Sequence, residues 1–335
     1  MIERAFQLLA ALAVLAAPGA SLAQAPAAAP ATSVVLPTQA GGPPASAPSP
    51  APAVNPNADL AFGAYQRGLY ATALKEATKR VSANPVDAPA MTLIGEIYRD
   101  GMSVKRDNAE AARWYKLASE LGNREAQFQL AVMLLQGAEG VSADRAAARA
   151  LLEKAAAQNH SGALYDLGVM AVEGEADSKP DFTKAADYFH RAAEAGDDNA
   201  AYSYGVLLRQ GRGVALDIDQ SAVWLKRAAD AGVVAGEVEY AIMLFNGVGV
   251  EKDEAAAAKL FAKAAAQNNP IAQNRLAHLY ASGRGVPKDL VRAAAWQRFA
   301  AAAGLEDKDL DAMLAGLSQS DLAKVEQIVR RQVGQ

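Results

Sequence analysis

Beyond residue 57, apolar residues recur every three or four positions in short runs that polar loops interrupt, a pattern typical of amphipathic helices. The interruptions return at a nearly constant distance. A glycine recurs every 36 or 37 residues, at Gly101, Gly137, Gly174, Gly211, Gly247 and Gly283. Repetition at this period predicts pairs of helices that stack into a solenoid, in which each pair packs mainly on its neighbours.

Two further positions keep the same register. An aspartate six or seven residues after each glycine suits the capping position of the second helix in each pair. These aspartates are Asp107, Asp144, Asp181, Asp217, Asp253 and Asp289. Seven residues later comes a large and mostly aromatic residue, which we expect the second helix to bury. These large residues are Trp114, Leu151, Tyr188, Trp224, Leu260 and Trp296.

Small residues predict close helix packing and helix ends. A glycine or alanine six residues before each repeated glycine stands where a neighbouring helix must approach the first helix closely. These residues are Gly95, Ala131, Gly168, Gly205, Ala241 and Ala277. The repeated glycine then ends the first helix in the left-handed conformation. Asn159 and Asn268 are expected to end two of the second helices in the same way.

This pattern resembles the Sel1-like repeat, a relative of the tetratricopeptide repeat. The strings Gly283-Arg284-Gly285-Val286 and Trp224-Leu225-Lys226-Arg227-Ala228-Ala229 carry the resemblance, and six copies cover residues 88–305. Residues 57–87 are similar to a plainer tetratricopeptide unit. The third copy departs most, because residues 175–179 replace the glycine-rich loop. The resemblance implies an all-α, right-handed α/α solenoid with protein–protein interaction and adaptor roles.

The two ends of the chain are predicted to differ from the repeats. Residues 1–23 indicate a secretory signal: Arg4 precedes an apolar run, and Ser21-Leu22-Ala23 suits cleavage near Ala23, although an uncleaved anchor is the alternative. Residues 24–56, uncharged and rich in proline and alanine, predict a disordered linker. The chain is therefore expected to be periplasmic or secreted.

Residues 306–335 no longer match the repeat and predict two capping helices, over 309–315 and 320–333. The second has an apolar face that consists of Leu322, Val325, Ile328 and Val329. The alternative for this helix is contact with a membrane surface or a partner through Lys324, Arg330 and Arg331.

The amino-acid composition excludes several kinds of functional site. The 335 residues are 51 % apolar and only 6 % aromatic, with a net charge of −4, no cysteine and three histidines. The absence of cysteine excludes disulfides, thiol nucleophiles and cysteine zinc sites. The net charge argues against nucleic-acid binding. The glycine loops lack the Lys-Ser/Thr of phosphate loops. We therefore expect no enzyme activity, no cofactor and no metal site.

By similarity with tetratricopeptide proteins, the first helices are expected to line a concave groove that binds a partner. The groove residues are Arg99, Phe128, Gln136, Tyr165, Tyr202, Arg209, Gln210, Phe245, Asn246, Asn274 and His278. Phe128, Tyr165 and Tyr202 recur in three consecutive copies and are expected to form an aromatic row. Such a row could hold an extended peptide or a helix. The alternative is that these three rings belong to the core between repeats.

The expected function is therefore that of an exported scaffold, which binds a protein or peptide partner of the cell envelope through the concave groove of the solenoid. Membrane contact would arise only through a membrane-protein partner. Two alternatives stay open. One is a periplasmic regulator that restrains a membrane sensor kinase, as some periplasmic Sel1-like proteins do. The other is an accessory protein that binds peptidoglycan or another glycan.

Overall fold

The computed structural model describes residues 59–174 and 179–333, which form sixteen helices and, apart from one isolated bridge between Ala138 and Val141, no β-structure. The first helices of the six pairs are α4 (Ala88–Asp100), α6 (Arg124–Gln136), α8 (Ser161–Glu173), α10 (Asp198–Gln210), α12 (Val234–Asn246) and α14 (Pro270–Ser282). The second helices are α5 (Asn108–Glu120), α7 (Arg145–Ala157), α9 (Phe182–Glu194), α11 (Ile218–Asp230), α13 (Glu254–Ala266) and α15 (Leu290–Ala302).

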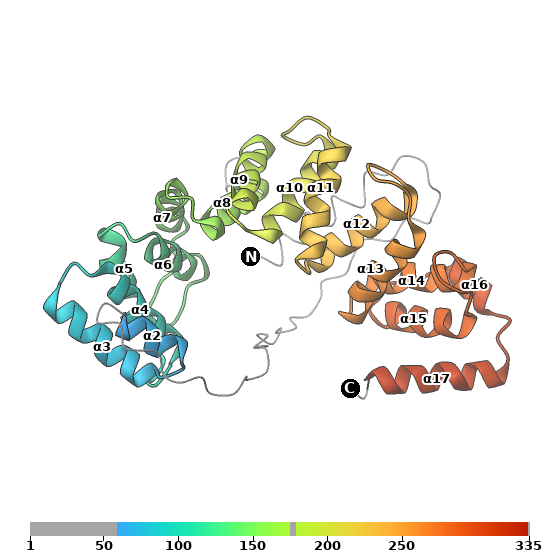
Figure 1. Ribbon diagram of the computed structural model, residues 1–335, viewed down its shortest axis with the longest axis horizontal. Helices are drawn as coiled ribbons and strands as arrows, with labels where there is room; N and C mark the ends of the chain where they lie inside the picture. The colour runs from blue at the N-terminus through green and yellow to red at the C-terminus, as the bar shows by residue number, and fades with distance from the viewer. Residues whose placement is uncertain (1–58, 175–178, 334–335) are drawn as a thin grey trace, which may run out of the picture.

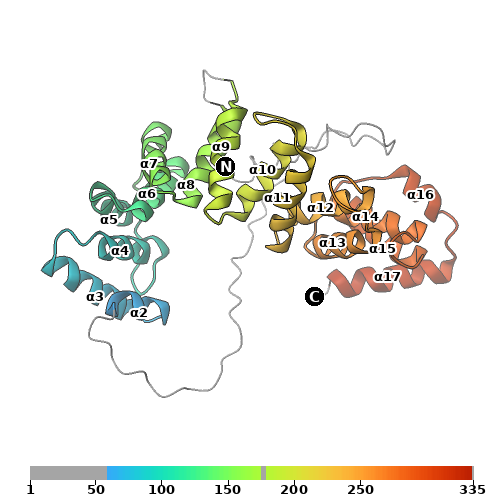
Figure 2. The same ribbon diagram turned by 45° about the horizontal axis from the view of Figure 1, so that its top comes forward.

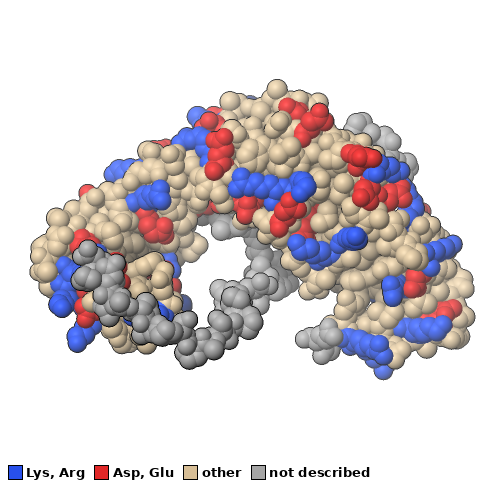
Figure 3. Space-filling view, in the orientation of Figure 1, with Lys and Arg blue, Asp and Glu red and all other residues tan. Residues whose placement is uncertain are grey.

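A shorter pair, α2 (Leu60–Gln66) and α3 (Tyr70–Ala83), precedes the six, and α16 (Lys308–Leu314) and α17 (Gln319–Val333) follow them. Each helix packs on its neighbours in sequence, so the chain forms an arch with α2 and α3 at one end and α15 to α17 at the other (Figures 1 and 2). The space-filling view shows the hollow under this arch (Figure 3). The fold is therefore the all-α solenoid that the sequence predicts.

Both kinds of predicted helix end are present. The six repeated aspartates cap the second helices, and the carboxylate of each accepts a hydrogen bond of 2.8–3.0 Å from the N–H three residues on. The six repeated glycines follow the first helices with φ between 61° and 74°. Gly101, Gly211, Gly247 and Gly283 adopt the predicted left-handed conformation, whereas Gly137 and Gly174, with ψ of 152° and 178°, do not. Asn159 and Asn268, with φ of 55° and 61°, also adopt the left-handed conformation, as predicted.

In each second helix, the large buried residue lies one position later in the sequence than predicted. The residues at the predicted positions are only partly buried, whereas the next residue is buried in every copy. In four copies this next residue is Tyr115, Leu152, Phe189 or Leu225, each with no exposed surface. It is this residue that faces the close-approach glycine: a Cβ added at Gly168 would lie 2.6 Å from the Phe189 ring. The predicted residue is rotated by 100° along the helix and so lies at the edge of the core.

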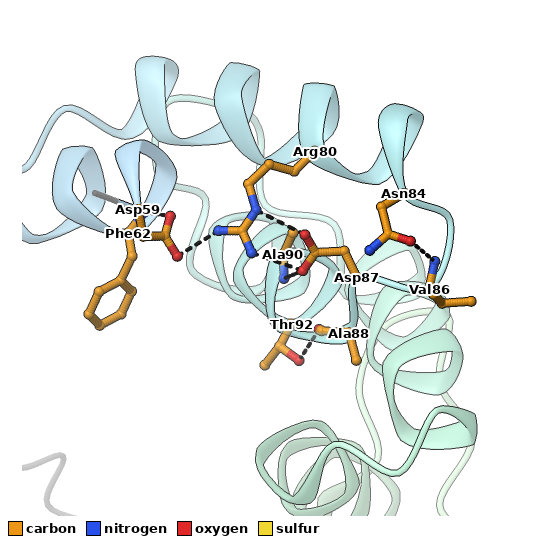
Figure 4. A network of polar contacts seen from close by, with 9 residues as sticks. All are labelled: Asp59, Phe62, Arg80, Asn84, Val86, Asp87, Ala88, Ala90 and Thr92. Carbon is orange, nitrogen blue, oxygen red and sulfur yellow. Dashed lines mark hydrogen bonds and ion pairs between the residues drawn. The ribbon is translucent and has the colours of Figure 1, made fainter. Parts of the chain in front are cut away.

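The two terminal units close the solenoid differently. At the N-terminal end, Arg80 of α3 bridges the two aspartates that cap α2 and α4 (Figure 4): its Nη1 lies 2.5 Å from Asp59, and its Nε lies 2.9 Å from Asp87. At the C-terminal end, Val325 of α17 is fully buried against Ala294 and Ala295 of α15. The apolar face of α17 is thus used within the fold, which leaves the membrane-surface alternative without an apolar face to insert.

Three sequence features lie outside the described residues: the predicted signal (1–23), the predicted linker (24–56) and most of the departure in the third copy (175–178). Within 59–174 and 179–333, every helix is too short or too polar to cross a lipid bilayer.

Candidate interaction surface on the first helices

The predicted aromatic row does not form a binding surface. Tyr165 and Tyr202 are only 5 % and 1 % exposed and belong to the hydrophobic core. Tyr165 lies three residues before Gly168, so both share a helix face. That face packs on α9, where the ring centroids of Tyr165 and Phe189 are 5.6 Å apart. For these two tyrosines the core alternative is therefore correct, and only the half-buried Phe128 reaches the surface.

The two predicted arginines bridge successive first helices. Arg99 of α4 binds Asp100 through two nitrogens, at 2.7 and 2.9 Å, and its Nη1 lies 2.5 Å from Gln129 of α6. Arg209 of α10 lies 2.6 Å from Glu239 of α12. Both side chains are only partly exposed. Their positive charges are therefore balanced within the protein.

The predicted residues nearer the C-terminus fall into two groups. Asn274 and His278 both bind Asp307, at 2.9 and 2.7 Å, so they hold the last capping segment and do not line an open groove. Burial opposes ionisation of Asp307, but hydrogen bonds from Asn274, the Leu310 N–H and His278 outweigh it and lower its pKa to about 2. Gln136 and Asn246 are exposed, whereas Gln210 and Phe245 are half-buried. The Arg284 guanidinium lies over the Phe245 ring at 4.1 Å.

A chain of polar contacts that the sequence analysis missed crosses three first helices. It begins at Asp100 and Arg99 of α4 and continues to Gln129 of α6. The Gln129 Nε2 donates to Glu125 at 2.6 Å, and the other Glu125 oxygen lies 3.0 Å from His160 Nε2. We call these five residues (Asp100, Arg99, Gln129, Glu125 and His160) the polar strip.

His160 joins the strip because it caps α8. Its Nδ1 accepts the Ala163 N–H at 3.2 Å, so its Nε2 carries the hydrogen and donates to Glu125. This hydrogen bond is the main cause of the lowered pKa of Glu125. The Phe128 ring stacks on His160 with centroids 4.4 Å apart. One signal for His160 was available in the sequence: it occupies the position where other first helices have Asn123, Asp197 or Asn269.

The polar strip is ordered yet accessible to solvent. Its charged members, Arg99, Asp100 and Glu125, keep between 28 % and 50 % of their side chains exposed, and His160 keeps 13 %. Mutual hydrogen bonds fix their geometry before any partner arrives, which reduces the entropy lost on binding. In Figure 1, α4 and α6 lie nearer the hollow of the arch than α5 and α7 do. The helices that carry most of the strip are therefore those on the inner side of the arch.

One carboxyl group on α8 lies in a different electrostatic setting. Burial, and secondarily the nearby negative charge of Asp197, raise the pKa of Asp166 to about 7. Asp197 caps α10, and burial raises its pKa as well. The carboxyl groups of Asp166 and Asp197 therefore both resist ionisation where the third copy meets the fourth.

The arginines of the two glycine-rich loops, which resemble phosphate loops in sequence, contact side chains of the preceding pair. The Arg212 guanidinium of the loop Gly211-Arg212-Gly213 lies 3.8 Å from the centroid of the Phe182 ring in the preceding pair. Arg284, of the similar loop Gly283-Arg284-Gly285, lies 2.5 Å from Glu254. Across 59–174 and 179–333, no three His, Asp or Glu side chains converge as a metal ion would require.

Comparisons with known proteins agree with this architecture. The family model described as Sel1 repeat matches residues 88–123, 124–160, 161–197, 198–233, 234–269 and 270–305. A protective antigen present in uropathogenic Escherichia coli strains, described as displaying an SLR fold, is similar over 82 % of this chain, with 26 % identity and a TM-score of 0.71. The match spans 60 % of the length of that antigen.

A Sel1 repeat protein from Oxalobacter formigenes is similar over 73 % of this chain and 97 % of its own, with 27 % identity and a TM-score of 0.60. No curated protein matches the chain.

Proposed function

The chain belongs to the Sel1 repeat family, and from that premise we propose that it is an exported scaffold whose polar strip binds a polypeptide partner in the cell envelope. Sel1 repeat proteins generally act as non-catalytic scaffolds for protein–protein interaction. The observation that carries the finer proposal is the strip itself, in which partly exposed charged and amide groups of α4, α6 and α8 are held in one hydrogen-bonded chain.

The strip fits a partner with both charges and free backbone groups. Arg99 and His160 supply donors, and Asp100 and Glu125 supply acceptors. Phe128, stacked beside His160, adds an apolar contact at one end. The strip combines one positive group, Arg99, with the carboxylates of Asp100 and Glu125 and with uncharged donors, so it favours a polar peptide over a uniformly charged polymer. Export is supported by the apolar run after Arg4 and the small residues up to Ala23.

Crosslinking in intact cells tests this proposal. Tagged wild-type protein is compared with a variant that carries Glu125→Ala and Gln129→Ala, and captured proteins are identified by mass spectrometry. The matched control carries Lys226→Ala and Asp230→Ala, an ion pair with the same four-residue spacing on α11. We expect a specific envelope protein to be lost from the strip variant and kept by the control.

Equal capture by all three forms would contradict the assignment of the strip. The identity of the captured protein also separates two of the functions considered. A sensor kinase would indicate a regulator, and a multi-protein envelope complex would indicate an adaptor.

A second candidate, glycan binding, is favoured by one observation away from the strip. His190, Tyr204 and Trp224, from three successive helices, bring their rings together with centroid distances between 4.7 and 5.7 Å, and all three stay partly exposed. Aromatic faces suit the apolar faces of sugar rings. Cosedimentation with purified cell-wall material tests this candidate. Binding that persists in a Trp224→Ala variant would argue against the cluster.

A further inference from the structure

Two bridges between successive first helices use an arginine at the same repeat position. Arg99 lies four residues after the close-approach Gly95, and it bonds Gln129, two residues before the close-approach residue of the next first helix. Arg209 and Glu239 occupy the same two positions in the fourth and fifth copies and lie 2.6 Å apart. The repeat thus has a place for a cation on one first helix and a place for its polar partner on the next.

The bridge between the second and third copies lacks its arginine. Asp166 of α8 occupies the partner position, whereas Leu135 of α6 stands at the position of Arg99 and Arg209 and packs against the hydrophobic core. Across residues 59–174 and 179–333, no lysine or arginine forms an ion pair with Asp166. Asp166 is therefore a carboxyl group at a place where the repeat puts a cation opposite, and the described chain does not supply that cation.

Asp166 continues the polar strip towards α10. It is half-buried, so part of its side chain meets solvent. The charge of Asp197, which caps α10, raises the pKa of Asp166, and His160, which caps α8, acts in the opposite direction. His160 in turn donates to Glu125 of α6. Carboxyl groups therefore lie on both sides of His160 at this end of the strip.

A buried hydroxyl group near these carboxyl groups also lacks a partner. Tyr165 is 5 % exposed, and its hydroxyl forms no hydrogen bond of normal geometry in the described chain, although Ser203 lies near it. Burial, and then the negative charges of Asp197 and Asp166, raise the pKa of Tyr165, which places its hydroxyl near both carboxyl groups. A buried hydroxyl without a partner is costly, and its oxygen can accept a hydrogen bond. A donor that reaches Asp166 can therefore satisfy Tyr165 as well.

From this geometry, and resting on the proposed function of the strip, we propose that Asp166 binds a lysine or arginine side chain of the polypeptide partner. The partner's cation takes the place that Arg99 and Arg209 hold in other copies of the repeat, and so completes the missing bridge. Its N–H groups donate to the Asp166 carboxylate and to the Tyr165 hydroxyl. A guanidinium group suits two acceptors better than an ammonium group does, because its donors are held in a planar fork.

The test uses the mature chain and a probe of defined charge. The probe is a capped pentapeptide with a central arginine between serine and glycine residues. In the control peptide, citrulline replaces the arginine and keeps its shape without its charge. NMR at pH 8 follows the side-chain carboxyl signals of Asp166 and Asp197 during titration with each peptide. We expect both signals to shift with the arginine peptide and to stay in place with the citrulline peptide.

Two variants remove the site in different ways. Asp166→Asn keeps the shape of the side chain without its charge, and Leu135→Arg supplies the missing cation from the chain itself. Each should weaken binding of the arginine peptide, followed through Asp197, about tenfold. Asp166→Asn removes the cost of ionising an enclosed carboxyl group, so lost binding would not arise from unfolding. The control is Asp230→Asn, which removes an exposed carboxylate on α11 and should bind like the wild type.

Three results would overturn the proposal: no shift with the arginine peptide, equal shifts with the citrulline peptide, or binding that both variants leave unchanged. The crosslinking experiment separates this failure from that of the proposed function. Asp166→Asn should lose the same protein as the strip variant. If the strip variant loses that protein and Asp166→Asn keeps it, the proposed function stands and the cation site is wrong. Equal capture by every form would contradict the proposed function instead.

Discussion

At the scale of single residues, the structural role of a histidine or a glycine depends on the atoms that surround it. His160 caps α8, binds Glu125 and stacks on Phe128, although a lone histidine carries little information in the sequence. Glycines with positive φ also differ. Some face open solvent, and others touch a neighbouring backbone. These differences predict distinct effects of mutation.

The loop glycines allow a matched comparison. Gly213→Ala places a methyl group against the Phe182 carbonyl, so we expect it to lower the free energy of unfolding by about 3 kcal/mol or more, since both overpacking and left-handed strain act. Gly122→Ala, with φ of 84° and nothing within 4 Å, should cost only about 1 kcal/mol. Urea denaturation followed by circular dichroism measures both. Equal losses would contradict the proposed close contact.

The raised pKa of Asp166 predicts that the stability of the fold depends on pH. Its pKa is about 7 in the folded chain and near 3.8 in an unfolded chain, so its ionisation destabilises the fold progressively as pH rises from about 4 to 7. Asp166→Asn removes this effect. At pH 8 we expect the free energy of unfolding of the variant, measured by urea denaturation, to exceed that of the wild type by about 1 to 3 kcal/mol. Near pH 4 the two values should be equal. A gain independent of pH would indicate a cause other than ionisation.

At the scale of elements, most helices are specified by their ends and held by the next pair, whereas the terminal helices depend on individual contacts. The seven residues of α2 form too short a helix to be stable alone. Arg80 links its capping Asp59 to the capping Asp87 of α4 (Figure 4). At the other end, α17 is held by its apolar face and by the Arg298–Glu326 ion pair.

Arg80→Ala should therefore loosen α2 selectively. Loss of the bonds to two carboxylates predicts a destabilisation of about 1 to 2 kcal/mol, visible as faster amide hydrogen exchange in α2 and the start of α4. The control is Arg113→Ala, which removes a single ion pair on α5 whose arginine is 76 % exposed and should cost less than about 0.5 kcal/mol. Uniform acceleration along the chain would show that Arg80 has no local role.

At the scale of the whole molecule, stacking of like pairs produces an arch with two unlike ends. Each pair contacts only its neighbours, so the stability of the arch is close to the sum of pair and interface contributions. The hollow and the polar strip follow from the repetition of first helices along this arch (Figure 3).

Export is also a prediction about the whole chain. Expressed in a Gram-negative host, the protein should be recovered from the periplasm with Gln24 as its first residue, as N-terminal mass spectrometry would show. Leu9→Arg interrupts the apolar run and should leave the chain uncleaved in the cytoplasm. Thr38→Arg, beyond the run, serves as the control. Periplasmic protein that keeps residues 1–23 would support the uncleaved anchor.

The amino-acid sequence by itself determined the elements of this protein: the period, the capping aspartates, the terminating glycines and the left-handed asparagines are local features, and local backbone physics suffices to place them. The tertiary structure alone decided which side chains face a neighbour. Tyr165 and Tyr202 are buried because the helix face that carries them packs on the next helix. For the same reason, the buried large residue of each second helix lies one position after the predicted one. The polar strip likewise joins residues 60 positions apart, from Asp100 to His160, because stacking brings successive first helices together, which no single repeat specifies.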